Sequence, residues 1–408
     1  MRTYELLIIG AGPAGLAAAC FSNFEKHEVA VLEQKSSPGK KLLIAGTGQC
    51  NLTNAIPTKD FLDKYGPNKK FVKNCLYKFK NTDLIEFFES NGLKTTTLPN
   101  NKVFPESMNS KDVLNTLLRI MDKKGVDLYC ESKVTGIQII DDGYLVTTQK
   151  DSFKTEFLCI ASGGKSYPST GSDGSMYSII ESLGHKINPH APALTPIITN
   201  NFNFTSCAGI GLKKTVIYHY RENKKVGTYN GDILFTHIGL SGPGILDNSR
   251  YFSENDILCL NLTEFKNAEE LENDLIFKLN GPRKKLKNLL SEYNIPERLL
   301  LNILSELNID PSKFSSEVNK KERKSIIRNL IELSFKIDQL GSYKTAMVTK
   351  GGVALMKVNP KTMESRMLPS LYFLGEVLDI DGDTGGFNIQ FAFSSAASAI
   401  DAINLKKI

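Results

Sequence analysis

The chain begins with an apolar run that leads directly into a glycine turn. Residues 4–9 are rich in leucine and isoleucine and predict a β-strand, and the small apolar residues after Pro13 predict a helix. A second short apolar run closes at Val31 and Leu32 and is followed by Glu33. The pattern therefore predicts a strand, a glycine turn, a helix, a strand and an acid, in that order.

The same alternation of helical and strand patterns continues over the next part of the chain. Helical spacing covers residues 60–91 and 111–123, and its apolar positions are interpreted as core rather than as a binding surface. Strands are predicted at 126–134, 137–140, 144–149 and 157–160, with Asp141-Asp142-Gly143 as the turn of a hairpin. The last of these strands ends in small residues, Ala161 to Gly164.

The pattern changes where Pro189, Pro192 and Pro196 interrupt the chain. Short alternating runs from about 197 to 262 predict a small β-barrel or sandwich, and residues 264–337 have leucine and isoleucine at helical spacing among charged residues. A strand is then predicted at 371–374, followed by a second glycine-rich turn and a helix of small residues over 391–402. A mixed α/β fold is therefore expected.

Composition limits the class of protein. With 408 residues, 41% of them hydrophobic, the chain is long enough for two or three domains. It has no apolar run of membrane-spanning length, and its amino-terminal segment is predicted to be a strand rather than a signal peptide. We therefore expect a cytoplasmic protein without a membrane partner. The seven cysteines form no C-x-x-C pair, so we expect free thiols and no metal site.

The net charge of +6 is modest, but two segments are strongly basic. Residues 59–80 hold seven lysines against two aspartates, and residues 283–287 read Arg-Lys-Lys-Leu-Lys. Such segments are either solvated helix faces or surfaces that attract a partner bearing phosphate groups.

The first glycine turn has the spacing that binds an adenine dinucleotide. Gly10 permits the turn, Gly12 lets the backbone approach a pyrophosphate, and Gly15 allows the helix to pack on the strand. Pro13 suits the first helical turn, whose free N–H groups attract phosphate. Glu33, about twenty residues downstream, can accept hydrogen bonds from a ribose diol.

Two other segments contain glycines and small polar residues. Residues 39–54 include Lys40, Lys41, Thr47, Gly48, Gln49, Cys50 and Asn51, and are expected to form a loop against a cofactor. The second glycine-rich turn, between Gly375 and Gln390, suits close approach to the ribityl and flavin end.

These motifs resemble, in the same order, those of the YhiN or HI0933-like family of bacterial flavoproteins, also called BaiN-like or aminoacetone-oxidase-like NAD(P)/FAD-dependent oxidoreductases. The resemblance also rests on residues 161–164, 234–243, 349–353 and 375–390. The resemblance implies a Rossmann-like FAD domain of the two-dinucleotide type made of residues 1–188 and 346–408. It also implies an insert at 189–345, with a β-barrel at about 190–262 and a helical part at about 263–345. Gln49 departs from the arginine usual in the family before Cys-Asn.

FAD, held without a covalent bond, is the expected resident cofactor because glycine-rich segments at both ends of the chain suit one long ligand. No second strand, G-x-G-x-x-G and helix unit is visible, so NAD(P)H is expected to dock transiently as electron donor. The predicted cofactor residues are Gly10, Gly12, Pro13, Ala14, Gly15, Glu33, Gln34, Lys40, Lys41, Thr47, Gly48, Asn51, Val134, Ala161, Ser162, Gly163, Gly375, Glu376, Asp379, Gly385, Gly386, Asn388 and Ile389.

Two residues are candidates for catalysis. Cys50 is either a proton donor or redox thiol beside the flavin, or a small buried residue in a tight loop. His237 is either an acid or substrate ligand, or a histidine that stabilises a turn. Glu376 and Asp379 either bond the ribityl chain or nearby backbone N–H groups, or only cap the following helix.

The resemblance implies an oxidoreductase that takes electrons from NAD(P)H and reduces an activated carbon–carbon double bond, in an enone or in uridine of ribosomal RNA. Two alternatives stay open. One is an FAD-dependent amine oxidase that releases hydrogen peroxide. The other is a flavin-loaded redox-sensing or binding protein without turnover.

Overall fold

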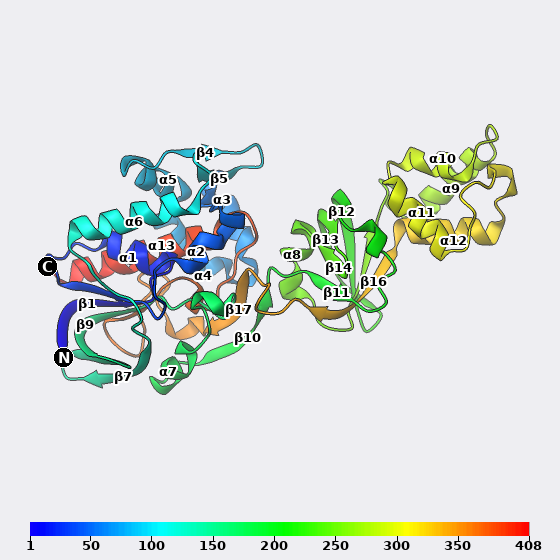
Figure 1. The fold of residues 1–408 in the computed structure, drawn as a ribbon. Helices are drawn as coiled ribbons and strands as arrows, with labels where there is room; N and C mark the ends of the chain where they lie inside the picture. The colour runs from blue at the N-terminus through cyan, green and yellow to red at the C-terminus, as the bar shows by residue number, and fades with distance from the viewer. Residues whose placement is uncertain (408) are drawn as a thin grey trace. The chain divides into compact units, whose positions relative to one another are not determined.

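The computed structural model describes residues 1–407 and divides into two compact units (Figure 1). Unit 1 comprises Met1–Ala193 and Tyr343–Ile408, and unit 2 comprises Leu194–Ser342. Each unit has its own cluster of buried hydrophobic residues. Unit 2 is therefore an insertion between two segments of unit 1.

The centre of unit 1 is a parallel sheet. β1 (Arg2–Ile9) lies between β2 (Val29–Leu32) and β9 (Ser152–Ile160), and β6 (Asp127–Tyr129) and β18 (Leu371–Phe373) extend it on either side. The inner half of β1 and all of β2 are buried, which is the pattern of parallel strands covered on both faces. β7 (Val134–Ile140) and β8 (Gly143–Thr148) add the predicted antiparallel hairpin.

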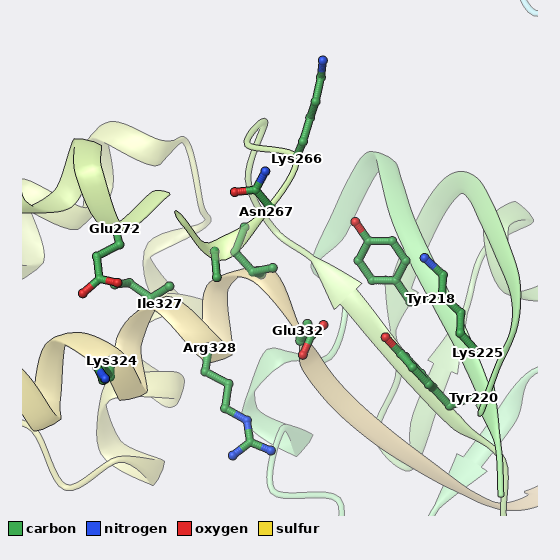
Figure 2. Close-up of a pocket in the computed structure, with 12 residues that line it drawn as sticks. Tyr218, Tyr220, Lys225, Lys266, Asn267, Glu272, Lys324, Ile327, Arg328 and Glu332 are labelled. Atoms are coloured by element: carbon green, nitrogen blue, oxygen red, sulfur yellow. The ribbon is translucent and has the colours of Figure 1, made fainter. Parts of the chain in front are cut away.

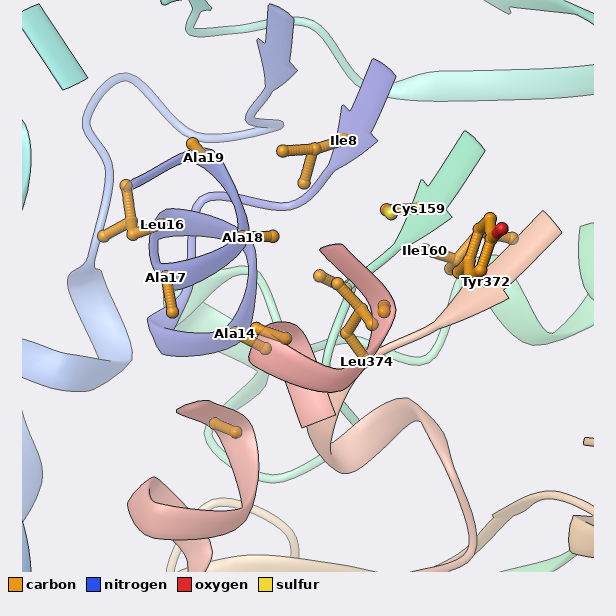
Figure 3. Packing of buried hydrophobic residues seen from close by; sticks show 14 of the residues in the cluster. Ile8, Ala14, Leu16, Ala17, Ala18, Ala19, Cys159, Ile160, Tyr372 and Leu374 are labelled. Atoms are coloured by element: carbon orange, nitrogen blue, oxygen red, sulfur yellow. The ribbon is translucent and has the colours of Figure 1, made fainter. Parts of the chain in front are cut away.

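Two helices rich in small residues pack near the glycine turns. α1 (Pro13–Phe21) is buried from Ala14 to Cys20, and it packs against α13 (Phe387–Lys406). Ile8 of β1, the alanines of α1 and Leu374, which follows β18, belong to one buried cluster, part of which is drawn in Figure 3. Alanine side chains let helix and strand backbones approach closely, so segments from opposite ends of the sequence share one core.

The remaining elements of unit 1 cover this core. They are α2 (Lys40–Ile44), α3 (Thr58–Phe61), α4 (Lys69–Lys78), α5 (Asn81–Ser90), α6 (Ser110–Lys124), α7 (Met176–Ser182), the small sheet of β3 (Thr53–Asn54), β5 (Lys102–Pro105) and β4 (Thr95–Thr97), and the antiparallel pair β10 (Ile187–Ala193) and β17 (Val348–Val353). The β10–β17 pair joins the two segments of unit 1 where the insertion leaves and returns.

Unit 2 contains a closed barrel and a helical part. The barrel runs β11 (Ile197–Thr199), β14 (Gly239–Ser241), β13 (Lys224–Phe235), β12 (Gly211–Arg221), β15 (Ile257–Asn261) and β16 (Leu333–Leu340). On β12 the buried residues alternate with half-buried ones from Thr215 to His219, as expected of a strand with one face inside a barrel. The helices are α8 (Pro243–Leu246), α9 (Ala268–Leu279), α10 (Leu286–Leu290), α11 (Glu297–Glu306) and α12 (Lys320–Ile331).

The α/β fold with an inserted barrel and helical part is confirmed. The helical prediction is wrong at its end, because the segment assigned to the helical part includes strand β16, which completes the barrel. Leu333, Phe335 and Ile337 are buried in alternation, a period of two that the preceding leucine-rich helices obscured. Within residues 1–407, no helix is long and apolar enough to cross a bilayer.

The separate cores predict that unit 1 folds without unit 2. Ala193 pairs with Val348, so a short Gly/Ser linker in place of residues 194–342 joins ends that β10 and β17 already hold close. We expect a cooperatively unfolding protein that binds the expected FAD and is therefore yellow, measured by flavin absorbance after gel filtration and by thermal unfolding. A colourless or aggregated product would show that unit 1 needs the insertion to fold.

Candidate functional site

The first glycine turn is fixed by close backbone contacts. Gly10 has φ of +105°, and a Cβ there would lie 2.5 Å from the Ala161 carbonyl oxygen. A Cβ on Gly15 would lie 1.9 Å from the Gly10 carbonyl oxygen, so α1 can cross the strand end only with glycine at this position. A Cβ on Gly12 meets nothing within 4 Å. Two of the glycines are therefore required by packing, whereas the third borders open space.

α1 presents its N-terminus at this open space. The helix begins at Pro13 after Gly12, and no side chain caps it. The first N–H groups of a helix have no partner within the helix and carry the positive end of its dipole. This end of α1 can therefore bind an anion.

Glu33 supports the turn from the end of β2. Its Oε2 accepts a hydrogen bond from the Ala11 N–H at 3.0 Å, and its Oε1 accepts one from the Lys35 N–H at 2.8 Å. Burial raises the pKa of the Glu33 carboxyl, against the effect of these hydrogen bonds. A carboxylate has further acceptor positions, so Glu33 can hold the turn and still accept from a ligand hydroxyl.

Buried polar atoms without partners gather after β9 and in the loop before β3. Ser162 Oγ, Ser172 Oγ and Asn51 Oδ1 are buried, and no residue of the described chain hydrogen-bonds to them. Ser172 Oγ lies beside Gly163, 3.0 Å from the position that a Cβ on Gly163 would take. Buried polar groups in proteins are normally paired, so these atoms fit a ligand that carries polar groups of its own.

The second glycine-rich segment meets the first. Gly375 has φ of +67°, and a Cβ there would lie 3.0 Å from the Ala14 Cβ at the start of α1. Gly386, with φ of +96°, precedes α13, and a Cβ there would lie 2.6 Å from the Thr53 carbonyl group. No side chain caps α13 either. The two turns thus lie in one region of unit 1 although their sequence positions differ by more than three hundred residues.

Polar contacts join the same segments. The Lys41 ammonium donates to Glu376 Oε2 at 2.7 Å, and the Thr349 N–H donates to Glu376 Oε1 at 2.8 Å. Asp379 Oδ1 accepts from the Gly351 N–H at 3.0 Å, and its Oδ2 accepts from Asn188 Nδ2 at 2.8 Å. Both carboxylates therefore hold main-chain segments together, whatever else they contact.

The other predicted cofactor residues also lie in unit 1, in varied environments. Thr47 is exposed, Lys40 and Ile389 are half-buried, and Val134 is buried at the start of β7. Gln34 donates to the Gly171 carbonyl oxygen, Asn54 donates to the Gly385 carbonyl oxygen, and Asn388 hydrogen-bonds both backbone groups of Gly382. Gly48 has φ of +88°. Ser172 was not predicted as a site residue, because a single serine in a loop carries no spacing signal, and Thr349 of β17 was named only as part of the segment 349–353.

The structure separates the two catalytic candidates. Cys50 lies in unit 1, fully buried, and burial raises the pKa of its thiol to about 12. A thiolate is the reactive form of cysteine, so this environment favours the packing role. His237 lies in unit 2, in the exposed loop between β13 and β14, where its carbonyl oxygen accepts from Thr205 Oγ1 at 3.1 Å. All seven cysteines are free.

A family model described as the HI0933-like protein Rossmann domain matches residues 4–402. The chain belongs to this family. It is therefore a flavin-dependent oxidoreductase, and FAD is its resident cofactor. The open space at Gly12, the uncapped helices and the unpartnered polar atoms described above fit that cofactor.

Several relatives match the chain over nearly its full length. It is 29% identical to the ribosomal RNA dihydrouridine synthase of Escherichia coli K12, covering all of both chains, and 31% identical to that of Haemophilus influenzae, covering 96% of each. It is 28% identical to a 3-dehydro-bile acid delta(4,6)-reductase of Clostridium scindens, covering 95% of this chain and 96% of the relative.

Solved structures confirm the fold. The 3-ketosteroid delta1-dehydrogenase of Sterolibacterium denitrificans matches all of both chains with a TM-score of 0.53 and 11% identity. A flavocytochrome c3 fumarate reductase covers 98% of this chain and 78% of its own, with a TM-score of 0.51 and 13% identity.

The two glycine environments predict different outcomes for the same substitution. Gly12→Ala places a methyl group in open space at an allowed φ, so we expect unchanged thermal stability and FAD binding weakened by about 1–3 kcal/mol. Gly15→Ala drives its methyl into the Gly10 carbonyl, so we expect a loss of folding stability of about 3 kcal/mol or more. Flavin titration and thermal unfolding measure both, and full FAD affinity in Gly12→Ala would contradict the assignment.

Glu33→Ala removes the acceptor for two main-chain N–H groups and for the predicted ribose diol. We expect FAD binding to weaken by about 1–3 kcal/mol, as for other unmatched buried polar groups. Glu33→Gln, which keeps one acceptor oxygen, is the matched variant and should lose less. Equal retention of FAD by wild type and Glu33→Ala, compared by ultrafiltration, would rule out the role.

Proposed function

We propose that the protein uses FAD to transfer a hydride from NAD(P)H to an activated carbon–carbon double bond, and that its substrate is uridine in ribosomal RNA. The observation that carries this proposal is the full-length match to two relatives named as ribosomal RNA dihydrouridine synthases. A substrate in ribosomal RNA implies a cytoplasmic protein.

The reaction saturates a double bond conjugated to a carbonyl group. The nicotinamide loses a hydride, the carbon β to the carbonyl gains one, and the α carbon gains a proton, so that uridine becomes dihydrouridine and NAD(P)H becomes NAD(P)⁺. FAD, when bound, carries the electron pair between the two.

The residues of unit 1 have positioning roles in this proposal. The N-terminus of α1 and the space at Gly12 receive the pyrophosphate, and Glu33 accepts from the ribose. Ser162 Oγ and Asn51 Oδ1, which are buried without a partner among the described residues, would hydrogen-bond to polar groups of the cofactor. In unit 2, the exposed His237 is proposed as a ligand of the substrate.

A second candidate substrate is a small enone. The third full-length relative is named as a reductase of a bile acid at delta(4,6), so it too reduces carbon–carbon double bonds. Both candidates share the same flavin chemistry and differ only in the size and charge of the substrate.

Anaerobic reduction and reoxidation separate these possibilities. The purified yellow protein is reduced by NADPH or NADH, then mixed with unmodified ribosomal RNA, with a steroid enone or with oxygen and an amine. We expect flavin reoxidation by RNA that is accompanied by dihydrouridine, detected by mass spectrometry of the digested RNA. Reoxidation by the enone alone would select the small substrate, and amine-dependent peroxide would select an oxidase.

A further inference from the structure

Unit 2 has a cavity of about 510 Å³ between the outer face of its barrel and its helical part (Figure 2). Tyr218 and Tyr220 of β12 and Lys225 of β13 line the barrel side. Lys324 and Arg328 of α12 line the helical side, and the loop before α9 adds Lys266 and Asn267. We call this the barrel–helix cavity.

The cations of the barrel–helix cavity are not neutralised. Lys225, Lys266, Lys324 and Arg328 are all exposed, and none of them has an ion-pair partner within residues 1–407. Of the two lining acids, Glu272 is already paired with Arg323 at 3.3 Å, which leaves Glu332. The cavity therefore has an excess of positive charge and favours an anionic ligand.

The basic segments singled out in the sequence behave differently. Arg283 pairs with Glu317 at 4.0 Å, Lys284 with Glu292 at 2.8 Å and Lys287 with Glu297 at 3.7 Å. In the other segment, Lys69 pairs with Asp63 at 3.1 Å. Much of the charge that looked available for phosphate groups is thus paired on the surface, whereas the cavity cations were scattered through the sequence.

The cavity also presents two aromatic rings. Tyr218 and Tyr220 are two residues apart on β12, so both point to the same outer face of the barrel, and both are half-buried. The Lys225 ammonium lies 4.2 Å from the centre of the Tyr218 ring. Tyrosine rings beside unpaired cations are the combination that binds single-stranded nucleic acid, because bases stack on the rings while phosphates contact the cations. An acidic peptide would use the cations but has no bases to stack.

We propose that the barrel–helix cavity binds a single-stranded segment of RNA and so contributes to recognition of the RNA substrate. This inference rests on the proposed function for its choice of RNA. Tyr220 supplies a stacking surface, Arg328 and Lys324 contact phosphates, and the buried Ile327 and Ile331 form the apolar floor.

Binding of a fluorescent oligouridine of about ten nucleotides, a length within the usual site size of single-strand binding folds, tests the cavity directly. Anisotropy is measured with the FAD-loaded full-length protein over a range of salt concentrations. We expect Tyr220→Ala to weaken binding about tenfold and Tyr220→Phe to restore it, since stacking needs the ring and not the hydroxyl. In the double variant K324A and R328A, the log–log salt slope should fall by about 0.7 for each lost phosphate contact.

The double variant K284A and K285A is the matched control, because it removes the same charge from the basic segment outside the cavity. It should bind oligouridine as the wild type does and keep its full FAD content. If this control weakens binding as much as K324A with R328A, the effect is one of net charge and the cavity proposal is overturned. Displacement of oligouridine by polyglutamate at equal charge concentration would also overturn it, in favour of an acidic peptide.

Failure of the proposal and failure of the proposed function give different results. If the wild type reduces ribosomal RNA and Tyr220→Ala has the same turnover and RNA binding, the cavity proposal is rejected and the proposed function is kept. Cavity-dependent oligouridine binding without any dihydrouridine would keep the cavity and reject the function. The rate at which NAD(P)H reduces the bound flavin should be the same in all variants, which checks that unit 1 is intact.

Discussion

Unit 1 depends on the close approach of backbones at the carboxyl end of its parallel sheet. The end of β1 lies against Ala161 at Gly10, α1 crosses that end at Gly15, and the second glycine segment reaches the start of α1 at Gly375. A side chain at Gly10 or Gly15 would overlap a carbonyl oxygen. Because hard-sphere contacts of this kind cannot relax, the positions of the helices around the cofactor region are set by the absence of side chains.

This constraint explains why so much of unit 1 could be predicted from the sequence. Glycines at fixed spacing after an apolar strand are a local signal, and they identify a turn, a helix start and an anion site together. The hairpin turn at Asp141 and Asp142 and the small-residue helix at the C-terminus were equally local, and the structure has both. The meeting of residues 10–15 with 375–390 was not a local signal and followed from the family resemblance.

The features that were predicted wrongly or missed depend on contacts between segments that are distant in the sequence. Residues 333–337 alternate as a strand, but the run of helices before them masked a pattern only a few residues long. The basic segment at 283–287 looked free because its partners, Glu292, Glu297 and Glu317, come from later turns and helices. The barrel–helix cavity draws its cations from three separate segments, β13, the loop before α9 and α12, so no window of sequence shows them together. Burial of Cys50 likewise depends on the whole core of unit 1.

The division of the chain into two units separates two kinds of recognition. In unit 1 the proposed cofactor region is built mainly from main-chain N–H groups, glycines and carboxylates that also bind backbone, and Gly10 and Gly15 have no room for a side chain. Relatives named for ribosomal RNA and for a bile acid match this chain over 95–100% of its length at 28–31% identity. Because these matches cover nearly the whole chain, we expect side chains rather than an added domain to distinguish a substrate in ribosomal RNA from a bile acid. The exposed lysines and arginine and the half-buried tyrosines of the barrel–helix cavity are residues of that kind, because none of them belongs to the core cluster of unit 2.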